Sequence, residues 1–151
     1  MVLLAGGKPK IVKCDEKDGF KITPAKLKAA ITKRTKWIIL NSPSNPTGSG
    51  YSKSEIQKLA KVLIKNKKVH ILSDDIYEHV KYDNFKFFTI AQISKLKSRT
   101  LTMNGVSKSY AMTGWRIGYA AGPKEIISAI RKIQSQSTSN PSSISQAAAV
   151  E

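Results

Sequence analysis

The chain has 151 residues, of which 40% are hydrophobic and 24% charged, a composition that favours one folded domain and argues against intrinsic disorder. No apolar run approaches the ~20 residues that a membrane-spanning helix needs, and the opening "MVLLAGGKPK" has no basic residue ahead of its apolar patch, so it does not resemble a secretory signal. Cys14 is the only cysteine, which excludes an internal disulfide and favours a reducing, cytoplasmic setting.

The charge is strongly basic, with 26 Lys and Arg residues against 10 Asp and Glu residues, or a net charge of +16. Such a surface can attract nucleic acid or other polyanions. The basic residues are, however, scattered over the whole chain, and no arginine-rich tract or nucleic-acid-binding motif is present. The pattern therefore favours lysines on solvated helix faces over a nucleic-acid interface.

Strands and helices are predicted in alternation along the first part of the chain. Residues 10–14, "KIVKC", are predicted as a short strand. A helix is predicted at 23–31, where Thr23 can cap the first turn and Pro24 suits the first helical position. Residues 36–41, "KWIILN", form a continuous apolar run, which is typical of a strand buried on both faces.

The clearest helix is predicted at residues 52–66. Ser52 and Glu55 have the spacing of a capping box, in which each side chain bonds to the backbone of the other residue. The apolar residues of this segment recur at helical spacing and form one stripe. The stripe consists of Ile56, Leu59, Ala60 and Leu63.

The second part of the chain continues the alternation. Strands are predicted at residues 69–75, 99–105 and 116–122. A final helix is predicted at 123–136, with Ile126, Ile127, Ile130 and Ile133 facing inward. Strands that alternate with helices predict a three-layer α/β fold, with a largely parallel sheet between flanking helices.

Polar side chains follow three of the predicted strands at the points where those strands end. Ligands bind to α/β sheets beyond the carboxyl ends of the strands, so these side chains should meet in one crevice. They are Asn45, Asp74, Tyr77, Ser107 and Lys108, with Arg116 at the start of the next strand. An aspartate after a strand usually caps a turn and a Ser-Lys pair is usually solvated, so only the convergence of the set indicates a site. A metal site is not predicted, because the two histidines and one cysteine form no cluster.

Three segments resemble the signature segments of the class I aminotransferases, which are pyridoxal-phosphate (PLP) enzymes of fold type I. They are "NSPSNPTG" (41–48), "SDDIYEH" (73–79) and "NGVSKSYAMTGWRIGYAAGP" (104–123). The resemblance is closest to bacterial aspartate aminotransferases and runs over essentially the whole chain in order and spacing. One departure is Asp75, where the family usually carries glutamate.

The resemblance implies a role for each of the six residues. Lys108 resembles the lysine that forms the internal aldimine with PLP and then carries the substrate proton. Asp74 resembles the carboxylate that pairs with the pyridine nitrogen of the cofactor. The catalytic set implied is Lys108, Asp74 and Tyr77, and the cofactor-binding set is Asn45, Asp74, Tyr77, Ser107, Lys108 and Arg116.

The family's roles also place these residues around the cofactor. Tyr77 and Asn45 resemble the donors to the phenolic oxygen of PLP, and Ser107 and Arg116 resemble part of its phosphate site. An arginine fork matches the geometry of a phosphate group. The resemblance further implies that the Asn45–Pro46 peptide bond is cis, which turns the chain sharply and aims Asn45 into the crevice.

The family's chain is much longer than 151 residues. The resemblance therefore implies that residues 1–151 form part of the PLP-binding large domain, without its N-terminal part and without the small domain. It implies a homodimer at full length, and as substrates an amino acid, with aspartate the first expectation, and a 2-oxo acid such as 2-oxoglutarate. Two alternatives stay open: another fold-type-I PLP enzyme, such as a β-lyase or decarboxylase, and an inactive basic fragment.

Overall fold

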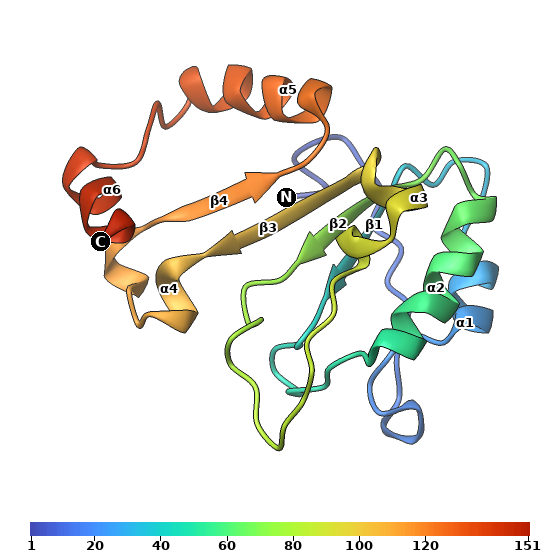
Figure 1. The fold of residues 1–151 in the computed structure, drawn as a ribbon. Coiled ribbons are helices and arrows are strands. Elements are labelled where there is room, and N and C mark those ends of the chain that lie inside the picture. Colours follow the sequence, from blue (N-terminus) through green and yellow to red (C-terminus); the bar gives the residue numbers. More distant parts are fainter.

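A four-stranded sheet organises the chain in the computed structural model, which describes all of residues 1–151. Its strands are β1 (Trp37–Asn41), β2 (His70–Asp74), β3 (Thr100–Gly105) and β4 (Gly118–Ala121), and they are paired in that order (Figure 1). The β1–β2 and β2–β3 pairs are parallel, whereas β4 runs antiparallel to β3. The predicted, largely parallel sheet is therefore confirmed, with one antiparallel strand at its edge.

The helices of the structure follow the predicted ones closely where local signals are strong. They are α1 (Pro24–Ala30), α2 (Lys53–Lys65), α3 (Ser94–Lys97), α4 (Val106–Ser109), α5 (Lys124–Ser135) and α6 (Ser143–Val150). The hydroxyl of Thr23 accepts a hydrogen bond from the Lys26 amide, and Ser52 and Glu55 form the predicted capping box. The helix α6 lies outside the predicted elements. None of the helices is both long and apolar enough to cross a membrane.

The predicted strand at residues 10–14 is wrong, because this segment pairs with no other strand. It lies instead beside α1, where Lys10 Nζ donates to the Ala30 carbonyl and Lys26 Nζ donates to the Lys13 carbonyl. The side chain of Ile11 stays exposed to solvent. The apolar pair Ile11 and Val12 between lysines is only a weak indication of a strand. A strand forms only where a neighbouring strand is present to pair with it.

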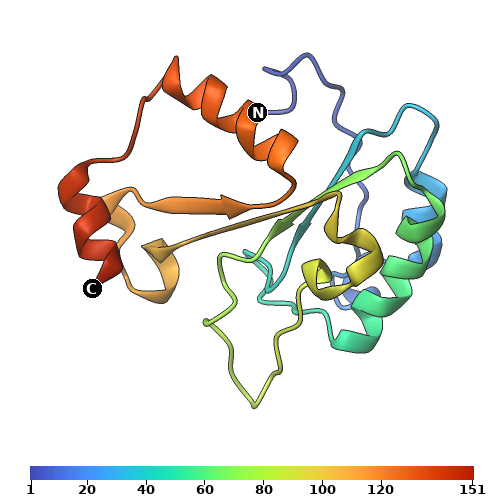
Figure 2. The same ribbon diagram turned by 45° about the horizontal axis from the view of Figure 1, so that its top comes forward.

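The hydrophobic core lies between the helices α1 and α2 and one face of the sheet. All four residues of the predicted α2 stripe are buried, and Leu63 and Leu59 are among the least exposed residues of the chain. From the sheet, Leu40 of β1 and Ile71 of β2 face this stripe. Figures 1 and 2 show α1 and α2 side by side on this flank of the sheet.

The opposite face of the sheet is only partly covered. Trp37 and Ile39 of β1 are 42% and 57% exposed, so the prediction that this strand is buried on both faces is wrong. The helix α5 covers the β3–β4 side of this face, where Ile127 and Ile130 line a hollow together with Met103. Helices thus lie on both sides of the sheet, which confirms the three-layer α/β class.

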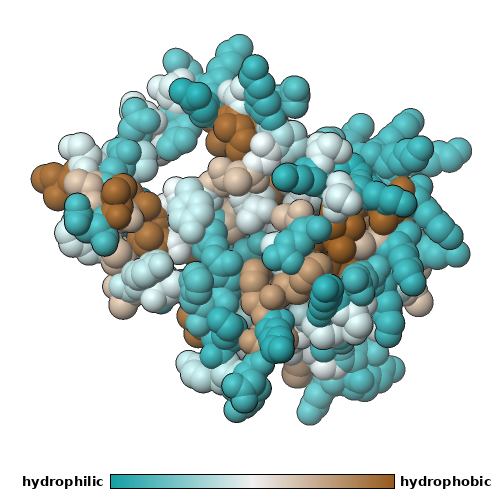
Figure 3. Space-filling view, in the orientation of Figure 1, coloured by the Kyte–Doolittle hydropathy of each residue, from teal (hydrophilic) through white to brown (hydrophobic).

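The helix α5 is less buried than its apolar pattern predicts. Ile126, Ile127 and Ile130 are half-buried, but Ile133 is 70% exposed, so the prediction that all four isoleucines face inward is wrong for Ile133. Figure 3 shows hydrophobic surface over α5 and α6 among hydrophilic side chains. Helical periodicity identifies an apolar face, but the face is buried only as far as another element reaches it.

Arg99 is a buried polar residue that supports the core. It is 9% exposed, and its guanidinium donates to the carbonyls of Leu63, Asn66 and Val69 near the end of α2. The last carbonyls of a helix have no partner within the helix, and a cation there is favoured by the helix dipole. Burial lowers the pKa of Arg99 below its ordinary value, and the fixed charge still joins α2, the following turn and the start of β3.

The carboxyl group of Asp75 is buried directly after β2. Asp75 is 3% exposed and accepts a hydrogen bond of 2.7 Å from the Ser73 hydroxyl, which lies 3.3 Å from the Thr89 hydroxyl. Burial raises the pKa of Asp75 and outweighs the opposing effect of the hydroxyl bonds. The folded state therefore holds the Asp75 proton more tightly than the unfolded chain does.

We predict that Arg99→Met lowers the free energy of unfolding by about 2–4 kcal/mol, because the carbonyls of Leu63, Asn66 and Val69 lose a charged donor. Arg34→Met is the matched control, since Arg34 is exposed and its replacement should change stability by less than about 0.5 kcal/mol. Urea unfolding followed by circular dichroism measures both. Equal effects of the two substitutions would contradict the assigned role of Arg99.

We predict that Asp75→Asn changes how stability depends on pH. The pKa of Asp75 in the folded state is raised above its ordinary value of 3.8. Ionisation of Asp75 therefore lowers the free energy of unfolding as pH rises from about 4 through the folded-state pKa. The stability of Asp75→Asn relative to the parent chain should therefore increase over that range and then level off. Urea unfolding between about pH 4 and pH 7 measures the difference, and a difference that falls with rising pH would overturn the assignment.

Candidate active site

The carboxyl ends of β1, β2 and β3 lie at one edge of the sheet. In the strand register, Asn41 pairs with Asp74 and Asp74 pairs with Met103. The arrowheads of these three strands point the same way in Figure 1, and the loops that carry the predicted site residues leave from them. The expectation that three strand ends deliver polar side chains to one region is confirmed.

Asn41, which the sequence reasoning missed, joins the ends of β1 and β2. Its Nδ2 donates to the Asp74 carbonyl at 3.1 Å, and its Oδ1 accepts from the Asn45 amide at 3.1 Å. The sequence feature that could have indicated Asn41 is its place at the end of a predicted strand, directly before a turn rich in Ser and Pro. The predicted cis bond at Asn45–Pro46 is confirmed, and Ser42–Pro43 is cis as well.

Three of the six predicted residues form a chain of contacts. Asn45 Nδ2 donates to Tyr77 Oη at 3.0 Å. The amine of Lys108 lies over the Tyr77 ring, with Nζ 6.0 Å from the ring centroid. The amide, the phenol and the amine thus come from the loops after β1, β2 and β3, as the convergence argument required. Asn45 and Lys108 are exposed, and Tyr77 is half-buried.

The other three predicted residues line one hollow. Asp74, Ser107 and Arg116 border a cavity of about 550 Å³, together with Met103 of β3 and Ile130 of α5. Asp74 is half-buried, and its Oδ1 accepts a weak bond of 3.4 Å from the Ile76 amide. The cavity therefore combines a carboxylate, a hydroxyl and a guanidinium with apolar walls, a composition that suits a small polar ligand.

Arg116 follows the short 3₁₀ turn η3 (Thr113–Trp115) and has a positive φ of 57°. One guanidinium nitrogen donates to the Thr113 carbonyl at 2.9 Å, and the other nitrogens form no hydrogen bond. The Thr113 hydroxyl in turn donates to the Ser107 carbonyl at 3.1 Å. The turn thus holds Arg116 near Ser107 and leaves part of its fork available to an anion.

The two groups of residues are adjacent. Ser107, which borders the cavity, directly precedes Lys108 in the sequence. Asp74, which also borders the cavity, lies three residues before Tyr77. Asn41 further links the backbone of Asp74 to that of Asn45. All six predicted residues therefore lie in one region, although the cavity itself is bordered by three of them.

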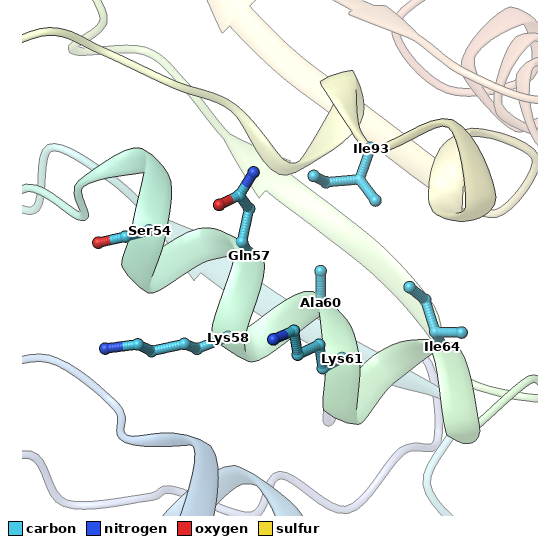
Figure 4. A pocket seen from close by; sticks show the side chains of 7 residues that line it. All are labelled: Ser54, Gln57, Lys58, Ala60, Lys61, Ile64 and Ile93. Atoms are coloured by element: carbon cyan, nitrogen blue, oxygen red, sulfur yellow. The ribbon is translucent and has the colours of Figure 1, made fainter.

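A second hollow, of about 440 Å³, lies on the surface of α2 and contains none of the predicted residues. In Figure 4, Ala60 and Ile64 of α2 point toward Ile93, and Lys58 and Lys61 extend away from them. Its polar lining residues are Ser54, Gln57, Lys58 and Lys61, so it has no carboxylate to pair with a cationic group, unlike the cavity at the strand ends.

A search of protein families matches residues 1–151 to the model for "Aminotransferase class I and II". An aspartate/prephenate aminotransferase of Cereibacter sphaeroides is 61% identical over 152 residues, which cover 100% of this chain and 38% of that protein. An aspartate aminotransferase of Rhizobium meliloti is 57% identical and covers 99% of this chain and 37% of its own length.

Two solved structures that are similar to this chain are also aminotransferases. The crystal structure of the Rhizobium meliloti aspartate aminotransferase matches 99% of this chain and 38% of its own, with a TM-score of 0.97 and 57% identity. An aromatic aminotransferase from Pyrococcus horikoshii matches 98% of this chain with a TM-score of 0.94 and 39% identity. The chain spans about 38% of the length of the relatives it matches, and it belongs to the class I and II aminotransferase family.

Proposed function

We propose that residues 1–151 supply the cofactor-binding part of a PLP-dependent aminotransferase. The observation that carries the proposal is the placement of Lys108 over Tyr77, beside a cavity that holds Asp74, Ser107 and Arg116. The donor set fits PLP, which needs an amine for its aldehyde, a carboxylate for its ring nitrogen and cations or hydroxyls for its phosphate. PLP, when bound, acts as an electron sink for carbanions at the substrate Cα.

Lys108 is the proposed base of this site. It is the third residue of α4 and is exposed, and its Nζ lies 6.0 Å from the centroid of the Tyr77 ring. A neutral amine there can attack a carbonyl carbon and can move a proton to or from a substrate carbon. Tyr77, held by Asn45, is placed to donate a hydrogen bond to an oxygen next to that amine.

Asp74 is proposed to face the ring nitrogen, and Ser107 and Arg116 to hold the phosphate. A carboxylate in a partly buried cavity favours a protonated nitrogen beside it. The hydroxyl and the free part of the guanidinium fork are the groups that bind phosphate oxygens with directional, charge-assisted bonds. The opposite charges of Asp74 and Arg116 give the cavity a polarity that matches a ligand with a cationic and an anionic end.

The proposal extends to the whole protein. We propose aspartate and 2-oxoglutarate as substrates, a homodimer and a cytoplasmic location, and we propose that residues 1–151 form part of the large, PLP-binding domain. The similarity to an aspartate/prephenate aminotransferase and an aspartate aminotransferase supports the aspartate proposal. They also favour amino transfer over the β-lyase or decarboxylase alternative.

We predict that PLP is captured at Lys108 before other lysines. The purified chain is incubated with substoichiometric PLP, reduced with borohydride and mapped by peptide mass spectrometry. The adduct should lie on Lys108 and should be lost in Lys108→Ala but retained in Lys61→Ala, the control on the exposed face of α2. An adduct spread over the exposed lysines would instead support the inactive basic fragment.

We predict that a chimera restores turnover. In it, residues 1–151 replace the matching part of the Rhizobium meliloti aspartate aminotransferase, which is 57% identical. The chimera should transaminate aspartate and 2-oxoglutarate with kcat in the ordinary range of about 1–1000 per second. Asp74→Asn should lower its kcat by at least about 100-fold, the usual loss for an electrostatic group in a site.

The isolated 151-residue chain should turn over the same substrates far more slowly than the chimera, because it spans only about 38% of the relatives' length. Coupled assays of both proteins at equal concentration make the comparison. Equal rates would show that the cofactor and substrate contacts of residues 1–151 suffice, and would contradict the proposal that they are one part of the site.

A further inference from the structure

The turn that carries Tyr77 has few ties to the strand that leads to Lys108. After β2, residues 76–79 form a turn closed by its own backbone bonds, from the Glu78 amide to the Asp75 carbonyl and from the Val80 amide to the Tyr77 carbonyl. The last backbone hydrogen bond between this turn and β3 joins the Asp75 amide to the Met103 carbonyl at 2.9 Å. Beyond that bond no backbone hydrogen bond joins the turn to β3, and the side chain of Ile76 lies against Gly105.

One side-chain hydrogen bond crosses this separation. Asn104 Nδ2, in β3, donates to Glu78 Oε1 at 2.6 Å. It is the one hydrogen bond between the turn and residues 104–109, the segment that ends in α4 and carries Lys108. Glu78 directly follows Tyr77, and Asn104 precedes Lys108 by four residues, so the bond joins the two segments close to both functional groups.

The Asn104 side chain is buried and has hydrogen bonds at both ends of its amide. It is 7% exposed, and its Oδ1 accepts from the Gly105 amide at 2.8 Å, so both ends of its amide are fixed. The next residue, Gly105, lies against β4: an added Cβ would come within 2.8 Å of the Ile117 carbonyl oxygen. The direction of the Asn104 side chain is thus set at both ends of its amide, and Gly105 packs too closely for a side chain to fit.

We propose that Asn104 and Glu78 form a clamp that sets the position of Tyr77 relative to Lys108. The clamp rests on the proposed function, in which these two groups act together, and both of its members are positioning residues. A carboxylate acceptor makes the bond stronger than one between neutral groups. Its loss would leave a buried amide donor without a partner, and only the apolar contact of Ile76 with Gly105 would then hold the turn to β3.

Glu78 has one other partner within ion-pair distance. His79 Nε2 lies 3.4 Å from the same Oε1 atom, but His79 is exposed and belongs to the same turn. It therefore cannot tie the turn to β3. The Asn104 bond is shorter, more buried and between different segments, so it alone has the geometry of a clamp.

The clamp is tested by substitutions that keep side-chain size. Asn104→Asp places a carboxylate against Glu78 and should break the bond. Adding Glu78→Gln to it allows the new amide to donate to the new carboxylate, which restores the bond with its direction reversed. Asn66→Ala is the control, because Asn66 also makes one partly buried side-chain bond, to the Val62 carbonyl within α2.

Two measurements are made on the 151-residue chain. The first is hydrogen exchange of peptides that cover residues 76–80, without PLP. The second is the rate of PLP capture at Lys108, trapped by borohydride. Asn104→Asp should speed exchange and slow capture, each by about fivefold to tenfold. The double variant should return both to within about twofold of the parent, and Asn66→Ala should change neither.

The outcomes separate the clamp from the proposed function. Unchanged exchange at residues 76–80 in Asn104→Asp, or no recovery in the double variant, would overturn the clamp. Faster exchange with recovery, but no change in capture, would show a structural bond that does not position Tyr77 and would also overturn the proposal. If the parent chain shows no preferential capture at Lys108, the proposed function fails, and the exchange measurement decides on the clamp alone.

Discussion

The parallel register of β1, β2 and β3 is the constraint on which the candidate site depends. It sets Asn41, Asp74 and Met103 side by side at one edge of the sheet. Asp74 is the last residue of β2, and the other predicted site residues except Arg116 follow one of these strands within a few residues. A slip of one residue would turn Asp74 to the opposite face of the sheet, because side chains alternate along a strand.

The strand register is stabilised mainly by packing on the face of the sheet that α2 covers. The buried stripe of α2 packs against Leu40 and Ile71, and Arg99 ties the end of α2 to the strands that follow. The other flank is thinner, since α5 contains no fully buried residue and Trp37 and Ile39 remain exposed. Asn45, Asp74 and Tyr77 therefore rest on the well-packed part of the chain. Arg116 belongs to the part with less packing.

The features that could be predicted from the sequence are those set by local physics. The capping box of Ser52 and Glu55, the cap at Thr23 and the stripe of α2 each depend on residues within a few positions of one another. The convergence of strand ends also followed, because it is a property of any parallel sheet. The six site residues were predicted from a family resemblance as well as from their places after strands.

The errors concern features that depend on distant partners. Residues 10–14 have a strand-like pattern but meet α1 and not the sheet. The outer face of β1 and the residue Ile133 are apolar, yet no element reaches them. Asn41, Arg99 and Asn104 were missed because the identity of a polar residue within or beside a strand does not reveal which carbonyl or carboxylate the fold will bring to it.

We propose that six side chains, from the carboxyl ends of β1, β2 and β3 with the segments that follow them and from the turn before β4, surround a single PLP molecule. A crystal structure of the chain with bound PLP tests it most directly. The account predicts continuous density from Lys108 Nζ to the cofactor, the ring nitrogen within hydrogen-bond distance of Asp74, and the phosphate against Ser107 and Arg116. PLP bound elsewhere, or bound at Lys108 with its phosphate toward Asp74, would contradict the account.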